Sequence, residues 1–471
     1  MSEHWAPASG HTTTVRQRVL HGLGVNAFGQ LVTVIVQLAG VPILLHAWGV
    51  QLYGEWLILF AIPAYLSMSD LGFSQSAAND MTARTARRDY TGALAVFQSL
   101  SVLVYSVSTL GLFLLTCVVF WLPLGEWLNL QSIDTSTAQW VLWLLAAQVL
   151  VALPDGVTHA GFRASGEYAL HFGLNGIVRL LQFVGVWLAA LLGGGPLAAA
   201  GVFIGVRTFA TVAFAVLLVY RHHWLCYGRA AASVGEMRRL LRPALASMAI
   251  PLAQALNIQG MVVAVGAGLG PAAVVVFTTL RTLTRLTMQM VIAVAKATEP
   301  ELASAFGAGN KKLLRDLFVS ALRAGLWLAL IAAAGLALFG SRVLELWTGG
   351  RVAMDFDLFC WLLASALASV LWFGALTVLK AANRHLRAAA VYVIASAVAV
   401  VLATALMFGL GELALVGVAL LAMDAVMAIY TIRAAVHLLE KQPRLLLMRA
   451  ADPRPIAALV YSRFPLWRER H

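Results

Sequence analysis

Residues 388–409 read AAAVYVIASAVAVVLATALMFG, a stretch without a single charged side chain. A helix needs about 20 mostly apolar residues to cross the hydrocarbon core of a bilayer. In lipid, the backbone N–H and C=O groups must bond within the segment, so an apolar stretch of this length is expected to be helical. Residues 388–409 therefore predict a transmembrane helix.

The rest of the chain has the same character. Of its 471 residues, 61% are hydrophobic and 11% are charged, and the mean hydropathy is +0.83. Soluble domains carry about 25% charged residues. Segments like the first one lie at 21–45, 53–78, 92–121, 138–162, 169–193, 196–220, 243–267, 271–298, 313–340, 356–380 and 412–438. We predict an all-α polytopic membrane protein with twelve transmembrane helices.

The positive charges indicate the orientation. Lysine and arginine follow the even-numbered segments, whereas the opposite loops hold only Arg342 and Arg351. The positive-inside rule then places both termini in the cytoplasm. The net charge of +12 is explained by this topology, so we expect membrane lipids as partners and no nucleic acid.

The second half of the chain resembles the first, with an offset of about 220 residues. Phe97 and Ser99 correspond to Phe318 and Ser320, and the junction 162–168 resembles 379–385. Such repeats predict two pseudo-symmetric six-helix bundles around a central cavity that opens to alternate sides. The expected organisation is a cytoplasmic segment 1–20, an N-lobe 21–220, a linker 221–242, a C-lobe 243–438 and a basic cytoplasmic tail 439–471.

Charged side chains inside the predicted helices are candidates for function, because each costs roughly 2.5–3.5 kcal/mol at the bilayer centre. The candidates are Arg179, Arg207, Arg281, Arg285, Asp155 and Asp424. Arginine forks bind phosphate in a bidentate manner, so the four arginines are predicted to bind a pyrophosphate. Asp424 and Asp155 are candidates for carrying a coupling proton. Alternatively, Arg179 and Arg207 pair with these two acids as structural ion pairs.

Uncharged polar stripes accompany the charges. Asn26, Gln30 and Gln37 share one face of the first helix, and the seventh helix offers Gln254 and Asn257. Amide groups both donate and accept hydrogen bonds, which suits sugar hydroxyls, so these five residues are predicted to bind a glycan. The alternative is ordinary hydrogen bonding between helices.

Motifs of soluble chemistry are missing from the sequence. It contains no GxxxxGK[ST], no GxSxG and no HExxH. Its three cysteines are scattered and suggest neither a disulfide nor a metal framework. We therefore expect a protein that is not an enzyme and has no metal and no cofactor.

Several short strings resemble those of a known family. They are Gly49-x-x-x-Tyr53-Gly54-x-Trp56, Asp70-Leu71-Gly72-Phe73 with Asn79, Arg281, Pro300-Glu301-Leu302, Leu346-Trp347-Thr348-Gly349-Gly350 and Ala382-Asn383-Arg384. In their order along residues 20–440 the chain resembles the bacterial lipid-linked oligosaccharide flippases of the O-antigen type. These form the polysaccharide-transport branch of the multidrug, oligosaccharidyl-lipid and polysaccharide exporter superfamily.

The resemblance implies a function. The chain would move a polyprenyl-pyrophosphate-linked oligosaccharide to the outer leaflet of the bacterial cytoplasmic (inner) membrane by alternating access, with other polysaccharide-assembly proteins as partners. It implies the cavity role for Arg281 and, by extension, Arg285. Related lipid II flippases carry arginines at the start of their first helix, which is uncharged here, so lipid II is disfavoured as the substrate. Two alternatives stay open: a multidrug or metabolite ion-coupled antiporter of the same superfamily, and a membrane glycan polymerase or ligase.

Overall fold

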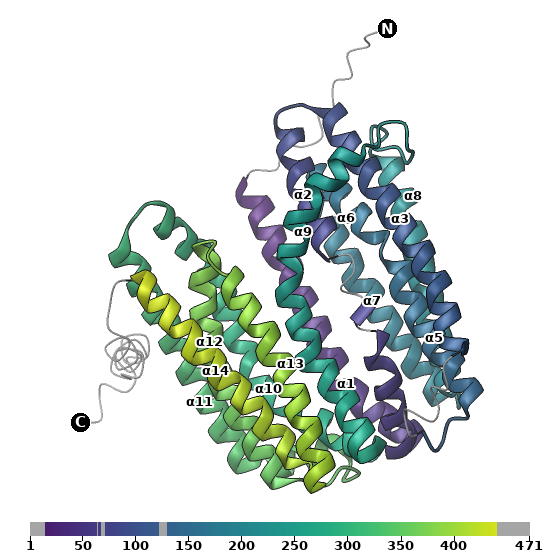
Figure 1. The fold of residues 1–471 in the computed structure, drawn as a ribbon, viewed down its shortest axis with the longest axis vertical. Coiled ribbons are helices and arrows are strands. Elements are labelled where there is room, and N and C mark those ends of the chain that lie inside the picture. The colour runs from purple at the N-terminus through teal and green to yellow at the C-terminus, as the bar shows by residue number, and fades with distance from the viewer. Residues whose placement is uncertain (1–14, 64, 67–70, 122–129, 440–471) are drawn as a thin grey trace, which may run out of the picture. The chain divides into compact units, whose positions relative to one another are not determined.

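The computed structural model describes residues 15–63, 65–66, 71–121 and 130–439 and is built from helices (Figure 1). The helices of the first half are α1 (Val15–Ala61), α2 (Leu71–Ala86), α3 (Tyr90–Trp121), α5 (Thr135–Ala152), α6 (Asp155–Ala164), α7 (Tyr168–Leu191) and α8 (Pro196–Arg221). Those of the second half are α9 (Val234–Ala255), a π-helix (Leu256–Gly260), α10 (Met261–Gly307), α11 (Lys311–Thr348), α12 (Phe356–Ala381), α13 (Leu386–Leu410) and α14 (Ala414–Leu439). The predicted all-α class is confirmed.

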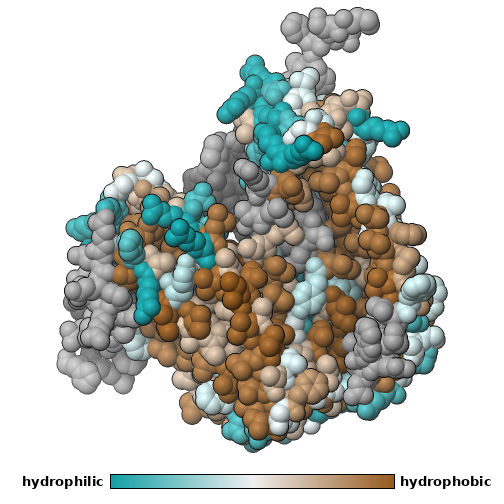
Figure 2. All heavy atoms as spheres, in the orientation of Figure 1, coloured by the Kyte–Doolittle hydropathy of each residue, from teal (hydrophilic) through white to brown (hydrophobic). Residues whose placement is uncertain are grey.

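The length and composition of the helices confirm a multi-pass membrane protein. Among the described residues, 10 helical stretches are long and apolar enough to span a bilayer. Large apolar side chains stay uncovered on them: Leu338 is 78% exposed and Phe209 is 77% exposed. Figure 2 shows hydrophobic residues over the middle of the helices on the visible face and hydrophilic residues near their ends. An apolar surface of this extent requires lipid as its solvent.

Two of these stretches each contain two predicted spans. α1 turns at Gly49 (φ 72°, ψ 178°), and α10 turns at Gly270 (φ 82°, ψ 177°). These two glycines lie at equivalent places in the two halves and have the same conformation. A residue with a Cβ is strained at such a φ, so glycine is required where each helix pair reverses.

Two predicted segments contain a break in the helix, although Thr135–Ala164 still counts as one candidate membrane span. In place of 53–78, α1 ends at Ala61 and α2 begins at Leu71, with Pro63 in the turn between them. In place of 138–162, α5 ends at Ala152 and α6 begins at Asp155, after Pro154. Proline lacks an N–H group and disfavours a helical conformation of the residue before it.

Other backbone details repeat between the halves. The Asp89 carboxylate accepts the N–H of Gly92 at 2.8 Å, and the Asn310 side chain accepts the N–H of Leu313 at 3.0 Å, so each caps the helix that follows it. The residues before these caps, Arg88 (φ 62°) and Gly309 (φ 67°), are both left-handed.

The junction between the fourth and fifth predicted helices also recurs. Glu167 N–H donates to Phe162 O at 2.8 Å, and Arg384 N–H donates to Leu379 O at 2.8 Å. This bond closes the same helix-ending motif in both halves. The shared geometry supports the internal repeat that the sequence suggested.

The chain divides into two compact units. The first comprises Met1–Gly40, Asp70–Leu114 and Ala147–Ala244, and the second comprises Val41–Ser69, Leu115–Ala146 and Leu245–His471. In the first unit, Val178 of α7 packs against Ala210 and Phe214 of α8. In the second unit, α12 packs along α14, and a core around Phe318 and Leu322 joins α10, α11, α12 and α14. The predicted lobe boundaries and cytoplasmic termini stay predictions.

A buried carboxylate anchors a loop within the second unit. Glu55 of α1 is fully buried and accepts the backbone N–H groups of Gln131 at 2.8 Å, Ser132 at 2.7 Å and Ile133 at 2.9 Å. Three amide donors satisfy a buried carboxylate without a cation. The loop before α5 is thereby fixed to α1, six residues after its turn at Gly49.

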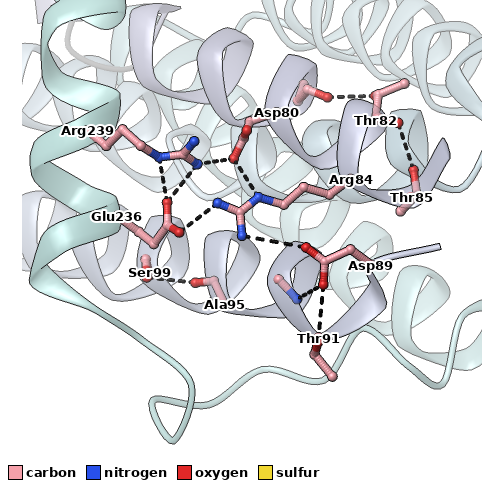
Figure 3. A network of polar contacts seen from close by, with 12 residues as sticks. Asp80, Thr82, Arg84, Thr85, Asp89, Thr91, Ala95, Ser99, Glu236 and Arg239 are labelled. Carbon is pink, nitrogen blue, oxygen red and sulfur yellow. Dashed lines mark hydrogen bonds and ion pairs between the residues drawn. The ribbon is translucent and has the colours of Figure 1, made fainter. Parts of the chain in front are cut away.

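A charged network within the first unit ties the first turns of α9 to α2 (Figure 3). Arg84 of α2 contacts Asp80 at 3.2 Å and Glu236 of α9 at 2.7 Å. Arg239 of α9 donates to Glu236 at 2.8 Å and also contacts Asp80. Asp89 lies 4.0 Å from Arg84. Two guanidinium groups thus share three carboxylates, which holds the first turns of α9 against α2.

Candidate functional site

A polar cavity of about 120 Å³ lies within the second unit. It is enclosed by α9, the π-helix, α10, α12, α13 and α14. Its polar lining residues are Gln254, Asn257, Arg281, Thr284, Arg285, Ser365, Ser369, Trp372, Tyr392 and Asp424. Five of these are predicted site residues from three separate stretches of the sequence: Gln254 and Asn257, Arg281 and Arg285, and Asp424.

Arg281 is held in place by a single partner residue. It is 9% exposed, its Nη1 donates to the backbone carbonyl of Asn257 at 2.9 Å, and its Nη2 donates to Asn257 Oδ1. The Phe277 ring lies 5.4 Å from the guanidinium carbon. These contacts orient the guanidinium, and both of its hydrogen-bond acceptors are neutral.

The local backbone makes this arrangement possible. Asn257 lies in the π-helix Leu256–Gly260, between α9 and α10. A π-turn shifts the hydrogen-bond register and is frequent at functional sites. The Asn257 amide nitrogen in turn donates to Met423 Sδ of α14, which fixes the side-chain orientation. Sequence patterns do not reveal a π-turn, so this detail was not predictable.

Asp424 of α14 is the acid of the cavity. It is 3% exposed, and it accepts hydrogen bonds from Trp372 Nε1 at 2.8 Å and from Ser365 Oγ. Both donors come from α12. Within the described residues, no ion pair joins Asp424 to Arg281. Arg179 and Arg207, the two arginines of the alternative structural pairs, do not line this cavity.

Arg285 lies one turn beyond Arg281 on α10 and is exposed. Its side chain has no hydrogen bond or ion pair in the part of the chain that the structure describes. Two guanidinium groups thus face one carboxylate across a small polar space. Such a cavity favours a negatively charged guest.

The other two predicted arginines belong to the first unit, where Arg207 forms a half-buried ion pair. Its Nη2 lies 3.0 Å from Asp155 Oδ2, and its Nη1 donates to Asn175 Oδ1 at 3.2 Å. His171 Nε2 lies 2.9 Å from the other Asp155 oxygen, and Thr158 donates to that oxygen at 2.9 Å. The structural pair left open from the sequence is present here.

Arg179 has a different environment. It is exposed, and its Nη1 donates to Thr33 Oγ1 of α1 at 3.1 Å. No carboxylate contacts it among the described residues. The guanidinium of Arg179 therefore has a neutral partner. The guanidinium of Arg207, in contrast, is paired with the Asp155 carboxylate.

The predicted glycan residues are divided between the units. Gln30 is half-buried and Gln37 is exposed on α1 in the first unit, while the Asn26 side chain lies outside the described residues. Gln254 is exposed and Asn257 is buried in the second unit. Asn257 uses its oxygen on Arg281, so its role is to position the guanidinium. A glycan-binding role for the five stays a prediction.

Five polar residues of the cavity were not predicted from the sequence, namely Thr284, Ser365, Ser369, Trp372 and Tyr392. Ser365 and Trp372 bind Asp424, and Tyr392 lies with its ring 4.9 Å from that of Trp372. A spacing of seven residues places Ser365 and Trp372 on one face of α12, which was the available signal. The described residues hold no group of three or more His, Cys, Asp or Glu side chains suited to a metal ion.

Comparison with known proteins identifies the fold. No family model and no curated protein matches the chain. A solved structure described as an inward-facing multidrug resistance MATE family transporter of the MOP superfamily matches with TM-score 0.69 and 16% identity, over 89% of this chain and 98% of that one. The structure of the MATE multidrug transporter DinF-BH matches with TM-score 0.62 and 13% identity, over 93% of this chain and 98% of that one.

A third match has a different description. It is a MOP superfamily transporter from Pyrococcus furiosus whose binding pocket is described as having reverse polarity, with TM-score 0.54 and 17% identity over 90% of this chain and 95% of that one. Identities this low establish the fold alone. The chain has the fold of MOP-superfamily transporters.

Proposed function

We propose that the protein is an alternating-access exporter of the ion-coupled antiporter type whose cargo is an organic anion. The fold supports the transport class. The charge of the cavity supports the cargo class, and the observation that carries it is Arg281, which is held by the neutral groups of Asn257 instead of a carboxylate.

The size of the cavity supports a moving mechanism. Its volume of about 120 Å³ is below the roughly 300–1,000 Å³ of sites that bind drug-sized ligands. An organic cargo enters only after the helices around the cavity separate. Widening and closing of such a cavity around a fixed guanidinium is what alternating access requires.

Asp424 is our candidate for coupling. Proton binding to its carboxylate would change the net charge of the cavity that holds Arg281 and Arg285. Cargo release and proton uptake would then be linked, because both depend on the net charge of the cavity. Export of an anion from an inside-negative cell is already favourable by about 2.3 kcal/mol per charge per 100 mV.

A second candidate is the export of a polyprenyl-pyrophosphate-linked oligosaccharide in a bacterial inner membrane, with polysaccharide-assembly proteins as partners. The observation that favours it is the spacing of Arg281 and Arg285 on one face of α10, which suits the two phosphates of a pyrophosphate. The solved neighbours do not support this finer assignment, and it ranks below the antiporter.

Transport into proteoliposomes tests the proposal. Purified protein is reconstituted, and uptake of a fluorescent organic anion is compared with that of a cation of similar size under an imposed pH gradient. We expect gradient-dependent anion uptake that Asp424→Asn uncouples from the gradient. Uptake of the cation alone would overturn the cargo class.

A deletion strain separates the second candidate. Accumulation of polyprenyl-linked glycan on the cytoplasmic leaflet, restored by the wild-type chain, would support the flippase. Normal surface polysaccharide in that strain would exclude it.

A further inference from the structure

A second pocket, separate from the polar cavity, lies at one end of the second unit. It has a volume of about 480 Å³ and is formed where the turn between α12 and α13 meets the last turns of α14. Its polar lining consists of Asn383, Arg384, Arg387, Tyr430 and His437. Leu386 and Leu438 add apolar surface. The pocket is therefore basic and partly apolar.

An apolar groove of about 280 Å³ lies between α13 and α14 in the same unit. Val391, Ile394 and Val398 of α13 form one wall, and Met423 and Val426 of α14 form the other. Every residue that lines the groove is apolar. Ile394 is 64% exposed and Val398 is 58% exposed, so the groove opens outward.

The pocket and the groove follow one another along the same two helices. Arg387 precedes Val391 by four residues on α13, and Tyr430 follows Val426 by four on α14, which is about one helical turn in each case. The groove continues to Leu402, so it is about 17 Å long at ~1.5 Å per residue. The basic pocket and the apolar groove thus lie end to end along α13 and α14, and we call the two together the α13–α14 seam.

The arginines of the pocket are available to a ligand. Arg384 and Arg387 are exposed, and neither side chain makes a hydrogen bond or ion pair within the described ranges. The sequence places this turn on the cytoplasmic side, where lipid headgroups are anionic. A guest of matching chemistry has a phosphate at one end and an alkyl chain at the other.

We propose that the α13–α14 seam binds one anionic glycerophospholipid, with its phosphate at Arg384 and Arg387 and an acyl chain in the groove beside Val391, Ile394 and Val398. Direct guanidinium–phosphate contacts fix the headgroup. The acyl chain covers apolar surface that faces outward. The proposal is independent of the cargo, because none of these residues lines the polar cavity.

Native mass spectrometry of the full chain in detergent tests the proposal. Phosphatidylglycerol and phosphatidylcholine with identical acyl chains are titrated separately, together with an inorganic phosphate control. We expect one phosphatidylglycerol to bind more tightly than phosphatidylcholine. The Arg384→Gln/Arg387→Gln double variant is expected to bind it at least about tenfold more weakly. Equal binding of the two lipids, or an unchanged double variant, would overturn the proposal.

Matched variants distinguish a bound lipid from a bound ion and from a second copy of the chain. Arg433→Gln removes an exposed arginine of α14 outside the pocket and is expected to leave binding unchanged.

Ala422→Trp fills the groove from an exposed position and is expected to weaken lipid binding without altering the melting temperature. If Ala422→Trp binds phosphatidylglycerol as tightly as the wild type, and inorganic phosphate alone displaces the lipid, the seam is only a site for an anion. A dimer that Ala422→Trp dissociates would assign the groove to a second copy. Either result contradicts the lipid.

Discussion

The backbone carbonyl of Pro271 fills the space that a side chain at Gly54 would need: a Cβ at Gly54 would lie 2.2 Å from that oxygen. Gly54 follows the turn at Gly49 in α1, and Pro271 follows the turn at Gly270 in α10. The span that follows Gly49 and the span that follows Gly270 therefore approach closely at Gly54, where no side chain separates them. The Gly54 position in the Gly49-x-x-x-Tyr53-Gly54-x-Trp56 string therefore has a packing explanation.

Gly54→Ala is predicted to destabilise the protein by about 1–3 kcal/mol, the usual cost of overpacking, because backbone atoms cannot move aside as a side chain can. The measurement is the melting temperature in detergent. Gly335→Ala is the control, because a Cβ there meets no atom within 4 Å. A variant Gly54→Ala that melts with the wild type would contradict the close approach.

Arg88 and Gly309 provide a reciprocal pair. Both are left-handed, with φ 62° and φ 67°, and a Cβ costs roughly 1–2 kcal/mol in this conformation. Arg88→Gly is predicted to raise the melting temperature and Gly309→Ala to lower it. Arg87→Gly removes the same charge from a neighbouring residue without relieving a left-handed backbone. Equal effects of the two arginine variants would mean that charge, and not conformation, is responsible.

The fold class could be predicted because lipid leaves one solution for long apolar stretches, as at 388–409. The repeat was visible in the sequence at Phe97 and Phe318, because each follows a capping residue by the same distance. The structure buries both side chains. The breaks at Pro63 and Pro154 were missed, because a window average of hydropathy does not respond to one missing N–H group. Gly49 and Gly270 set the turns, yet glycine is common throughout apolar helices.

The site was predictable in part. Charge and depth identified Arg281, Arg285 and Asp424, which share a cavity because α10 and α14 both pack against α12 and α13. The same reasoning could not distinguish Arg207, which pairs with Asp155, from Arg179, which does not. Whether an arginine meets an acid depends on helix rotation, which the sequence does not specify. Glu55 was overlooked because its partners are backbone amides.

The network of Figure 3 predicts a measurable coupling between α2 and α9. Arg84 and Glu236 are 2.7 Å apart, with side chains 21% and 20% exposed. A double-mutant cycle to alanine should give a coupling of about 1 kcal/mol that decreases with added salt. The control cycle uses Arg342 and Glu345, which are 3.5 Å apart and 82% and 62% exposed. Similar couplings in both cycles would show that the network adds nothing.

Glu167 should make stability depend on pH. Burial raises the pKa of its carboxyl group, but hydrogen bonds from Arg221 at 2.6 Å and His222 at 3.1 Å outweigh burial and hold the net pKa below its ordinary value. The stabilisation is present above the unfolded pKa of about 4.3 and is lost as the pH falls through the lower folded pKa. Melting curves from pH 7 to acid should therefore be flatter for Glu167→Gln than for the wild type. A variant with the same acid dependence would refute this role, and Glu345→Gln is the control.

Asn257→Asp tests most directly whether the charge of Arg281 binds the cargo. The change preserves shape and supplies a carboxylate to the guanidinium that Asn257 already holds. If the free charge attracts the cargo, anion uptake into proteoliposomes should fall roughly 10–100-fold, the equivalent of about 1.5–3 kcal/mol for a hydrogen bond to a charged group. The melting temperature should be kept or raised. Wild-type anion uptake by Asn257→Asp would show that Arg281 is only structural, and would contradict the account.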